Sequence, residues 1–328
     1  MQRRSFITIL GGAAAWPLAA RAQQPKKIPR IGFLWHAASH EEEKPFIDWV
    51  TQGFTDLGYV EGKNIVFEER FPDEQPARFA ALAAELVSLN VDIIVAPSTP
   101  SALAAQKATS TIPIIFLPNP DPVGLGLVAT LARPGGNITG LSSMGFDIIT
   151  KRVQFFKEAV PRLARAALLM NPSSKYDAEK QELEYQAAAS RFKVTVERVE
   201  AKQAADLEAI FSDIKQRGFD GVFVSQTPMY FIESKRIAAL AIANGIPTMT
   251  PADQFVKNGA LLSYAAEWKP LYTGAAVYAK RILDGEKPAD MPVQQATKFE
   301  LVVNQITAKA LGLNLPESFL VHADKVIE

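Results

Sequence analysis

Two apolar segments in the middle of this chain, each followed by a polar loop, constrain its fold more than any other feature. Val91–Ala96 and Ile112–Leu117 are predicted to be strands, and their apolar character indicates that both are buried. Ser98 and Thr99 follow the first strand, and a polar loop at residues 119–121 follows the second. Ligands bind at the carboxyl ends of the strands in open α/β sheets. These loops are therefore predicted to line a ligand pocket.

Strands and helices alternate from the N-terminal region to residue 131. Lys27–Trp35 and Asn64–Phe71 are predicted to be two further strands of this series. Helices are predicted from apolar residues at helical spacing and from Pro and Gly at the boundaries, over 45–57, 77–90, 101–109 and 124–131. Such a βαβ series predicts the α/β fold class, with a mostly parallel sheet and helices on both of its faces.

The pattern restarts after the turn cluster Pro134–Asn137, which predicts a second lobe of similar size. Strands are expected at 138–142, 164–170, 193–199, 221–225 and 246–249, and helices at 148–160, 177–191, 204–217 and 232–244. The tail, with a helix at 272–283, a strand at 299–303 and a helix at 306–311, is too short for a third domain. It is expected to cross between the lobes, giving 28–142 with 264–292 as lobe 1 and 143–263 with 293–328 as lobe 2.

Residues 1–22 have the features of an export signal. Arg3 and Arg4 precede an apolar centre, and Ala20-Arg21-Ala22 is an A-x-A cleavage site, so cleavage is expected after Ala22. An uncleaved anchor is the alternative, but Gly and Pro interrupt a segment shorter than the roughly 20 residues that span a bilayer. The paired arginines resemble the twin-arginine motif, and the general secretory route stays open. Localisation in the periplasm is therefore predicted.

Charge and cysteine content exclude several classes of partner. The chain has 35 basic and 35 acidic residues, and the predicted signal contains three of the arginines and no acid. The mature chain is therefore slightly acidic, which gives no electrostatic reason to expect nucleic acid or an anionic membrane surface as a partner. The absence of cysteine excludes disulfides and thiolate metal sites. A chain of this length suggests two domains.

The segment Ser98-Thr99-Pro100-Ser101 begins a predicted helix directly after a buried strand. Hydroxyls and free N–H groups at a helix N-terminus can bind an anion, which predicts a site for a ligand carboxylate. The alternative is an ordinary helix cap, which needs only one of these hydroxyls.

Two further patterns have weaker functional interpretations. Gly124, Gly126 and Ala129 form a G-x-G-x-x-A sequence, but three prolines separate it from the preceding strand and prevent the tight turn of a dinucleotide site. His36 and His40 have the spacing of a metal pair, but they fall in a predicted loop after the first strand. No cofactor and no metal are therefore expected, and His36 is predicted to line the pocket.

The second series also has polar loops at the ends of strands. If the two lobes face each other, these loops converge with those of the first series on one cleft, although turn formation alone could explain their composition. No catalytic signature is found, which predicts that the protein is not an enzyme, although a secreted hydrolase stays an alternative. The candidate ligand-binding residues are His36, Ser98, Thr99, Asn119, Asp121, Asn171, Ser173, Tyr176, Gln226, Tyr230 and Asp253.

Several separated blocks resemble one protein family. These are GFTDLGYVEGKNI, the segment from Val91 to Phe116, DPVGLGLVATLARPGGNITG, LMNPSS and KFELVVNQITAKALGLNLP. Together they resemble the substrate-binding components of ABC importers, in the group that includes tryptophan-type binding proteins. The resemblance implies a type I periplasmic-binding-protein fold, with two Rossmann-like lobes joined by three crossover hinge segments. It also implies a monomer that performs no catalysis and delivers an amino acid or related small organic acid to a membrane permease.

The sequence departs from this group at Gln226-Thr227-Pro228, where tryptophan-type members have an acidic loop suited to a ligand ammonium. A buried ammonium without a carboxylate partner would cost several kcal/mol. The hypothesis is therefore a carboxylate ligand without an α-amino group, aromatic or branched, with Ser98 and Thr99 binding its acid group. Asp253 keeps an amino acid as the second possibility, and a ligand-presenting sensor is a further alternative.

Overall fold

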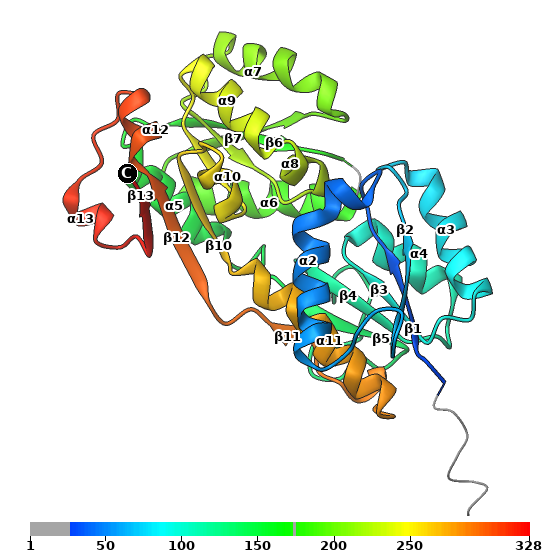
Figure 1. The fold of residues 1–328 in the computed structure, drawn as a ribbon. Coiled ribbons are helices and arrows are strands. Elements are labelled where there is room, and N and C mark those ends of the chain that lie inside the picture. The colour runs from blue at the N-terminus through cyan, green and yellow to red at the C-terminus, as the bar shows by residue number, and fades with distance from the viewer. Residues whose placement is uncertain (1–26, 173–174) are drawn as a thin grey trace, which may run out of the picture.

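The computed structural model describes residues 27–172 and 175–328, and it forms two lobes side by side (Figure 1). The predicted signal segment and Ser173 lie outside the described residues.

The first lobe is built on a six-stranded sheet in the order β11-β5-β4-β3-β1-β2. All of its strand pairs are parallel. Strands β3, β4 and β5 are buried along their whole length, as expected for a sheet covered on both faces. The strands are β1 (Arg30–Leu34), β2 (Val66–Arg70), β3 (Ile93–Ala96), β4 (Ile114–Asn119), β5 (Ile138–Ser142) and β11 (Gln294–Gln295).

The second lobe is built on a seven-stranded sheet in the order β13-β12-β10-β9-β8-β6-β7. Its strand pairs are parallel except for β10 with β12, which is antiparallel. The strands are β6 (Arg165–Met170), β7 (Thr195–Glu200), β8 (Gly221–Val224), β9 (Thr248–Thr250), β10 (Leu262–Ala266), β12 (Phe299–Asn304) and β13 (Lys325–Ile327).

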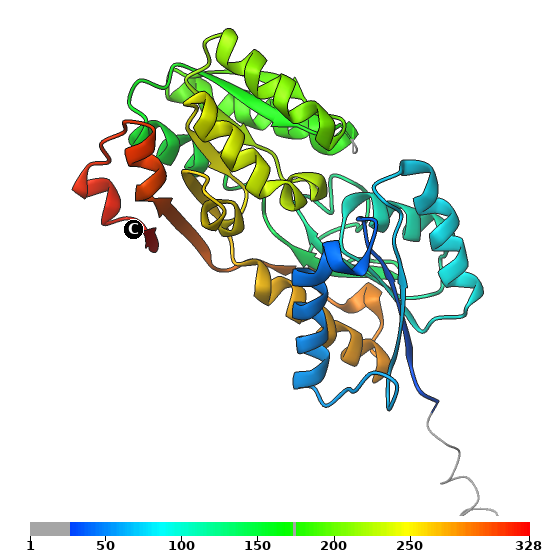
Figure 2. The ribbon, with the colours of Figure 1, turned by 45° about the horizontal axis from the view of Figure 1, so that its top comes forward.

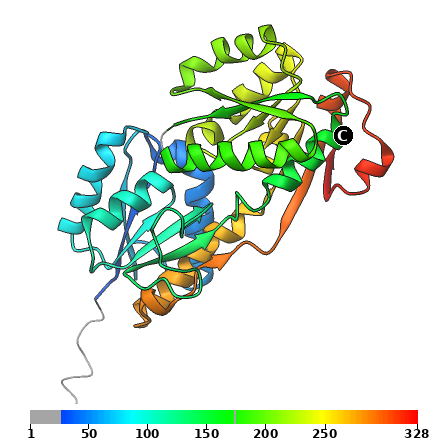
Figure 3. The same cartoon turned by 180° about the vertical axis from the view of Figure 1, so that it is seen from behind.

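Helices cover both faces of each sheet (Figures 1 and 3). The first lobe has α2 (His40–Asp56), α3 (Pro76–Ser88), α4 (Thr99–Ala108) and α11 (Trp268–Leu283). The longer helices of the second lobe are α5 (Ile149–Ala159), α6 (Lys175–Arg191), α7 (Leu207–Gln216) and α9 (Ser234–Asn244). Its short helices are α8 (Pro228–Ile232), α10 (Asp253–Lys257), α12 (Gln305–Ala310) and α13 (Glu317–Leu320), with 3₁₀ turns at Ala204–Asp206 and, in the first lobe, at Pro288–Asp290.

The chain crosses between the sheets three times, after β5, after β10 and after β11. The tail thus contributes α11 and β11 to the first lobe and β12 to the second. The lobe boundaries stay a prediction, and the sheet membership differs from them at two places. β10 continues to Ala266 in the second sheet, and Gln294–Gln295 pair with β5 in the first. These crossings place the carboxyl ends of both sheets opposite each other (Figure 2).

The first helix begins earlier than predicted. It starts at His40 rather than at Pro45, with the Ser39 hydroxyl as N-cap accepting from the Glu42 N–H. Pro45 lies inside α2, where the missing N–H removes a single helical hydrogen bond near the start. His40 is therefore on the helix and not in a loop, so the prediction of a loop from His36 to Glu43 was wrong over its second half.

The helix predicted over 124–131 is absent. Residues 121–128 form a series of turns in which the Leu125 N–H donates to the Asp121 carbonyl and the Gly126 N–H donates to the Val123 carbonyl. Gly126 has a φ of 72°, which a right-handed helix excludes. The G-x-G-x-x-A segment therefore has no helix N-terminus at which a pyrophosphate could bind.

Candidate functional site

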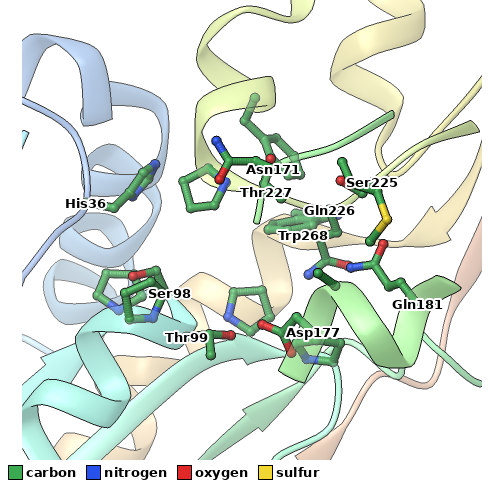
Figure 4. A pocket seen from close by; sticks show the side chains of 18 of the residues that line it. His36, Ser98, Thr99, Asn171, Asp177, Gln181, Ser225, Gln226, Thr227 and Trp268 are labelled. Carbon is green, nitrogen blue, oxygen red and sulfur yellow. The ribbon is translucent and has the colours of Figure 1, made fainter. Parts of the chain in front are cut away.

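A cavity lies between the carboxyl ends of the two sheets and has about 680 Å³ of empty space, part of it open to solvent. Figure 4 shows side chains from both lobes around it. The first lobe contributes His36, Phe46, Pro97, Ser98, Thr99, Pro100, Pro118, Pro120, Trp268 and Tyr272; the second contributes Met170, Asn171, Asp177, Ala178, Gln181, Ser225, Gln226, Thr227, Pro228 and Phe231.

Ser98 and Thr99 lie where the sequence predicted, at the start of α4, but their hydrogen bonds differ from the predicted anion site. Ser98 and Ser101 form a reciprocal capping box, in which each hydroxyl accepts from the other residue's N–H. Pro100 in the first turn has no N–H. The helix N-terminus therefore offers a ligand fewer donors than predicted, and Thr99 is the residue there whose N–H and hydroxyl are not used in the box.

Asn119 and Asp121 support the cavity wall without lining it. The Asn119 side-chain amide donates to Thr99 Oγ1 at 3.1 Å and accepts from the Asp121 N–H at 2.9 Å. Asp121 in turn accepts from Tyr176 Oη of the second lobe at 2.6 Å. Four predicted site residues, Thr99 among them, are therefore joined in one hydrogen-bonded chain beside the cavity.

The wall formed by the second lobe carries buried hydroxyl groups without partners. Ser225 Oγ and Thr227 Oγ1 have no hydrogen-bond partner among residues 27–172 and 175–328, and Ser225 is 2 % exposed. Gln226 Nε2 donates to Ser143 Oγ at 3.4 Å. Asn171 donates to the Lys202 carbonyl at 3.3 Å. A ligand with acceptor or donor groups can satisfy the two hydroxyls, whose burial would otherwise cost free energy.

Aromatic rings form the apolar part of the cavity, and they come from three helices and both lobes. The ring centroids of Phe231 on α8 and Trp268 on α11 are 4.4 Å apart. Phe46 on α2 lies 5.9 Å from Phe231 and 4.9 Å from Tyr272. Such a wall suits an aromatic or branched apolar group, which it can contact from both lobes at once.

His36 lies shortly after β1, lines the cavity and is paired with an acid. Its Nδ1 lies 2.6 Å from Glu43 Oε1, and the side chains are 5 % and 1 % exposed. Burial lowers the pKa of His36, but the nearby carboxylates, Glu43 above all, together more than offset this, so the pKa lies above its ordinary value. Burial raises the pKa of Glu43, but His36 and two backbone N–H groups outweigh burial and leave it below its ordinary value. Both pKa shifts have the direction expected for two groups that form an ion pair.

The cavity opens into a larger groove, which has about 2050 Å³ of empty space including open solvent and which shares His36, Asn171 and Thr227 with the cavity. Glu74 lines this groove, and burial raises its pKa to about 7. His36 opposes this shift, whereas the nearby acidic groups add to it.

The structure separates the predicted site residues into three groups. Five of them line the cavity: His36, Ser98, Thr99, Asn171 and Gln226. Asn119, Asp121 and Tyr176 form the supporting chain described above. Tyr230 and Asp253 are not part of the lining, and Ser173 lies outside the described residues. Which of these residues contact a ligand stays a prediction.

Tyr230 and Asp253 have structural partners instead. Tyr230 is fully buried in the core, and its hydroxyl donates to the Ala201 carbonyl at 3.5 Å. Asp253 lies in the first turn of α10 and forms an ion pair with Lys257 at 2.6 Å, one helical turn away. Asp253 therefore gives no support for an ammonium partner in the cavity.

Four polar lining residues were not among the candidates: Ser225 and Thr227, which flank Gln226 in a loop, and Asp177 and Gln181, which lie on a helix. Asp177 and Gln181 are on α6, four residues apart and so on the same face. Their spacing was visible in the sequence, but only the tertiary structure shows that this face meets the first lobe.

Within the described residues, no group of three or more His, Cys, Asp or Glu side chains could hold a metal ion. No helix in the same part of the chain is long and apolar enough to cross a bilayer.

The comparison with known proteins agrees with this architecture. The family described as "ABC transporter substrate binding protein" matches residues 34–327. This chain belongs to that family. The tyrosine-binding protein of Clostridioides difficile (strain R20291) is 30 % identical over 300 residues, which cover 88 % of this chain and 82 % of that relative. The predicted resemblance is therefore confirmed, and proteins of this family serve transport rather than catalysis.

Solved structures of similar proteins share the fold. A conserved domain protein from Vibrio cholerae superposes with a TM-score of 0.83 at 27 % identity, over 92 % of this chain and 100 % of that one. The ABC domain from Streptococcus pneumonia in complex with L-Trp gives a TM-score of 0.83 at 24 % identity, over 91 % and 99 %. The predicted type I periplasmic-binding-protein fold with two parallel-sheet lobes is confirmed.

Proposed function

We propose that this protein is the exported substrate-binding component of an ABC importer and that it binds a small aromatic or hydrophobic organic acid between its lobes. One observation carries the proposal: the cavity has an aromatic wall built by both lobes, and the second lobe adds buried hydroxyls that have no partner within the described residues. A ligand that contacts both lobes stabilises the closed arrangement, because those contacts exist together only there.

The aromatic wall, the hydroxyls and Asp177 together favour an aromatic amino acid. Thr99, Ser225 and Thr227 supply donors for a carboxylate, and the rings accommodate the side chain. Asp177 supplies a carboxylate for an ammonium within the cavity. Asp177 on α6 thus takes the place of the acidic side chain that residues 226–228 lack. The name of the Clostridioides difficile relative, tyrosine-binding protein, supports the same ligand class.

An aromatic or branched acid without an amino group is the second candidate. Gln226-Thr227-Pro228 contains no carboxylate. His36 Nε2 is buried and has no hydrogen-bond partner within the described residues, so the ring at the cavity wall can bond to an anionic ligand. These features match an acid with a single negative charge and no ammonium.

The remaining parts of the proposal come from the predicted export signal and from the family. The protein is exported with cleavage after Ala22, acts as a monomer without catalysis, and passes its ligand to a permease in the inner membrane. A sensor that presents its ligand to a membrane receptor differs only in this last partner.

Isothermal titration of the chain from Gln23, stripped of ligand by unfolding and refolding, tests the ligand class. The panel is L-tyrosine, L-tryptophan and L-leucine, the deaminated analogue of each, and D-arabinose as a control. Tight binding of an aromatic amino acid is expected, and Asp177→Asn should weaken it at least tenfold while leaving the deaminated analogue unaffected. At a hundred times the Kd the ligand should also stabilise the fold by about 2.7 kcal/mol.

Preference for the deaminated acids would decide for the second candidate, and binding of the sugar alone would refute both. Uptake of the labelled ligand by cells with and without the gene separates importer from sensor, because only an importer component changes uptake.

A further inference from the structure

A hydrogen bond between Tyr176 and Asp121 joins the two lobes beside the cavity. Tyr176 Oη on α6 of the second lobe donates to Asp121 Oδ2, in the loop after β4 of the first lobe, at 2.6 Å. Figure 3 shows the start of α6 next to the first lobe. Burial and the Asp121 carboxylate raise the pKa of Tyr176 to about 12, so the tyrosine keeps its proton at neutral pH and acts as the donor. The bond is possible only when the lobes are close.

Two further hydrogen bonds connect Asp121 through Asn119 to Thr99 in the cavity wall. The Asp121 N–H donates to Asn119 Oδ1 at 2.9 Å, and Asn119 Nδ2 donates to Thr99 Oγ1 at 3.1 Å. Thr99 Oγ1 is thereby an acceptor within the protein, so its hydroxyl hydrogen is available to a group in the cavity that Thr99 lines. The chain of bonds orients Thr99 as a donor toward the ligand.

Gly124 provides the space that this bond needs. Its N–H donates to Asp121 Oδ1 at 2.9 Å. A Cβ at this position would lie 1.8 Å from Tyr176 Oη and 2.3 Å from Asp121 Oδ2. The φ of Gly124 is outside the left-handed region, so the backbone itself accepts alanine. The clash with Tyr176 would arise only in the closed arrangement of the lobes.

We infer that Tyr176 and Asp121 form a latch that stabilises the closed state and that, through Asn119, positions Thr99 to donate to an acceptor group of the ligand. The part that concerns the ligand rests on the proposed function. The part that concerns closure does not, because the bond is made within the protein. Tyr176 and Asp121 are positioning residues: they act on the lobes and on Thr99, and the ligand need not touch them.

The closure part is tested without ligand, by measuring the distance between spin labels on the two lobes in the stripped protein. Tyr176→Phe removes the donor and should shift the distribution toward longer distances. Gly124→Ala should do the same by steric exclusion, and it should add nothing in a Tyr176→Ala background. Tyr264→Phe, a partly buried tyrosine of the same lobe, is the matched control and should leave the distances unchanged. Identical distributions for Tyr176→Phe and the unchanged protein would overturn the latch.

The ligand part is tested with the tightest ligand from the titration panel. Tyr176→Phe should speed dissociation by about tenfold or more, as expected for loss of a hydrogen bond to a charged group, with little change in the association rate. Thr99→Val should weaken binding, whereas Thr99→Ser should preserve it. The effects of Tyr176→Phe and Thr99→Val should be less than additive, because they share one chain of bonds. Strict additivity would refute the positioning of Thr99.

The two sets of measurements distinguish the possible failures. If no panel compound binds, the proposed function fails while the distances still test the latch. If ligand binds and the lobes of Tyr176→Phe stay closed, the latch fails while the proposed function stands.

Discussion

His36 Nδ1 lies 2.6 Å from Glu43 Oε1, and this ion pair closes the loop between β1 and α2 in a buried position. Glu43 Oε1 also accepts from the backbone N–H groups of His36 and Ala37, at 2.9 and 3.0 Å. One carboxylate thus holds both the side chain and the backbone at the cavity wall. A buried pair of this kind is costly to break, because removing one partner leaves the other charge uncompensated.

Glu43→Gln should therefore destabilise the fold by about 3 kcal/mol, since the amide cannot compensate the His36 charge. The free energy of unfolding in urea at neutral pH measures this loss. Glu42→Gln is the matched control, because Glu42 is exposed and its amide oxygen can still accept from the Ala38 N–H. The control should change stability by less than about 0.5 kcal/mol. Equal effects of both variants would contradict the role of the pair.

Glu74 should make the stability depend on pH near neutrality. Burial raises its pKa to about 7 from an ordinary 4.5, so the folded state favours the protonated form. The stability that this provides is complete below pH 4.5 and is lost as pH rises through 7. Glu74→Gln cannot ionise and should be more stable than the unchanged protein above pH 7, by about 1 to 3 kcal/mol, with no gain below pH 4.5.

Urea unfolding at pH 4, 6 and 8.5 checks this difference. Glu61→Gln, at an exposed position outside the charged groups that act on Glu74, is the control and should show no such pH-dependent gain. The protonated form of His36 also stabilises the fold, and this contribution is lost as pH rises past the raised pKa of His36. Both Glu74→Gln and the unchanged protein contain His36, so comparing the two removes this contribution.

Ser225 and Ser263 provide a matched pair for the ligand contacts. Both are buried, at 2 % and 1 % exposed, and neither hydroxyl has a hydrogen-bond partner within the described residues. Ser225 lines the cavity, whereas Ser263 on β10 lies outside it. Either serine changed to alanine should leave stability unchanged or raise it by about 1 kcal/mol.

Only Ser225→Ala should weaken ligand binding, by about tenfold, because only this hydroxyl can donate to the ligand. Titration and thermal unfolding of both variants give the comparison. Unchanged affinity in Ser225→Ala would remove this residue from the ligand contacts.

Gly53 allows α2 and α11 to pack closely. A Cβ there would lie 2.4 Å from the Thr273 carbonyl oxygen, a backbone atom that can move only with its helix. Gly53→Ala should cost about 1 to 3 kcal/mol, although alanine is the better helix former by about 1 kcal/mol. Gly136→Ala is the control, since a Cβ at that position would have nothing within 4 Å. Thermal unfolding of the two variants should differ, and equal midpoints would refute the close packing.

The sequence predicted most strands because their apolar character depends only on local residue types. β3 and β4 are completely buried, and their apolar runs already required this. Helix boundaries were less accurate where two local signals conflicted. Ser39 as N-cap and Pro45 as a first-turn residue both indicate a helix start, and the structure uses Ser39. The turns at 121–128 depend on Gly126 in the left-handed region, which the residue type permits but does not require.

The candidate site was predictable where it is made of loops at strand ends and unpredictable where it depends on contact between lobes. Ser98, Thr99 and Asn171 follow from the rule that ligands bind at the carboxyl ends of strands. Tyr230 resembles a wall residue in the sequence, but its ring is in the core.

The alternation of apolar and amphipathic segments was by itself enough to determine two α/β lobes, because hydrophobic periodicity is a property of neighbouring residues. Only the tertiary structure decided that Tyr176 bonds to Asp121 and that the α6 face with Asp177 lines the cavity. Those contacts join residues far apart in the chain, and their geometry depends on how the three crossings set one lobe against the other, which no local pattern encodes.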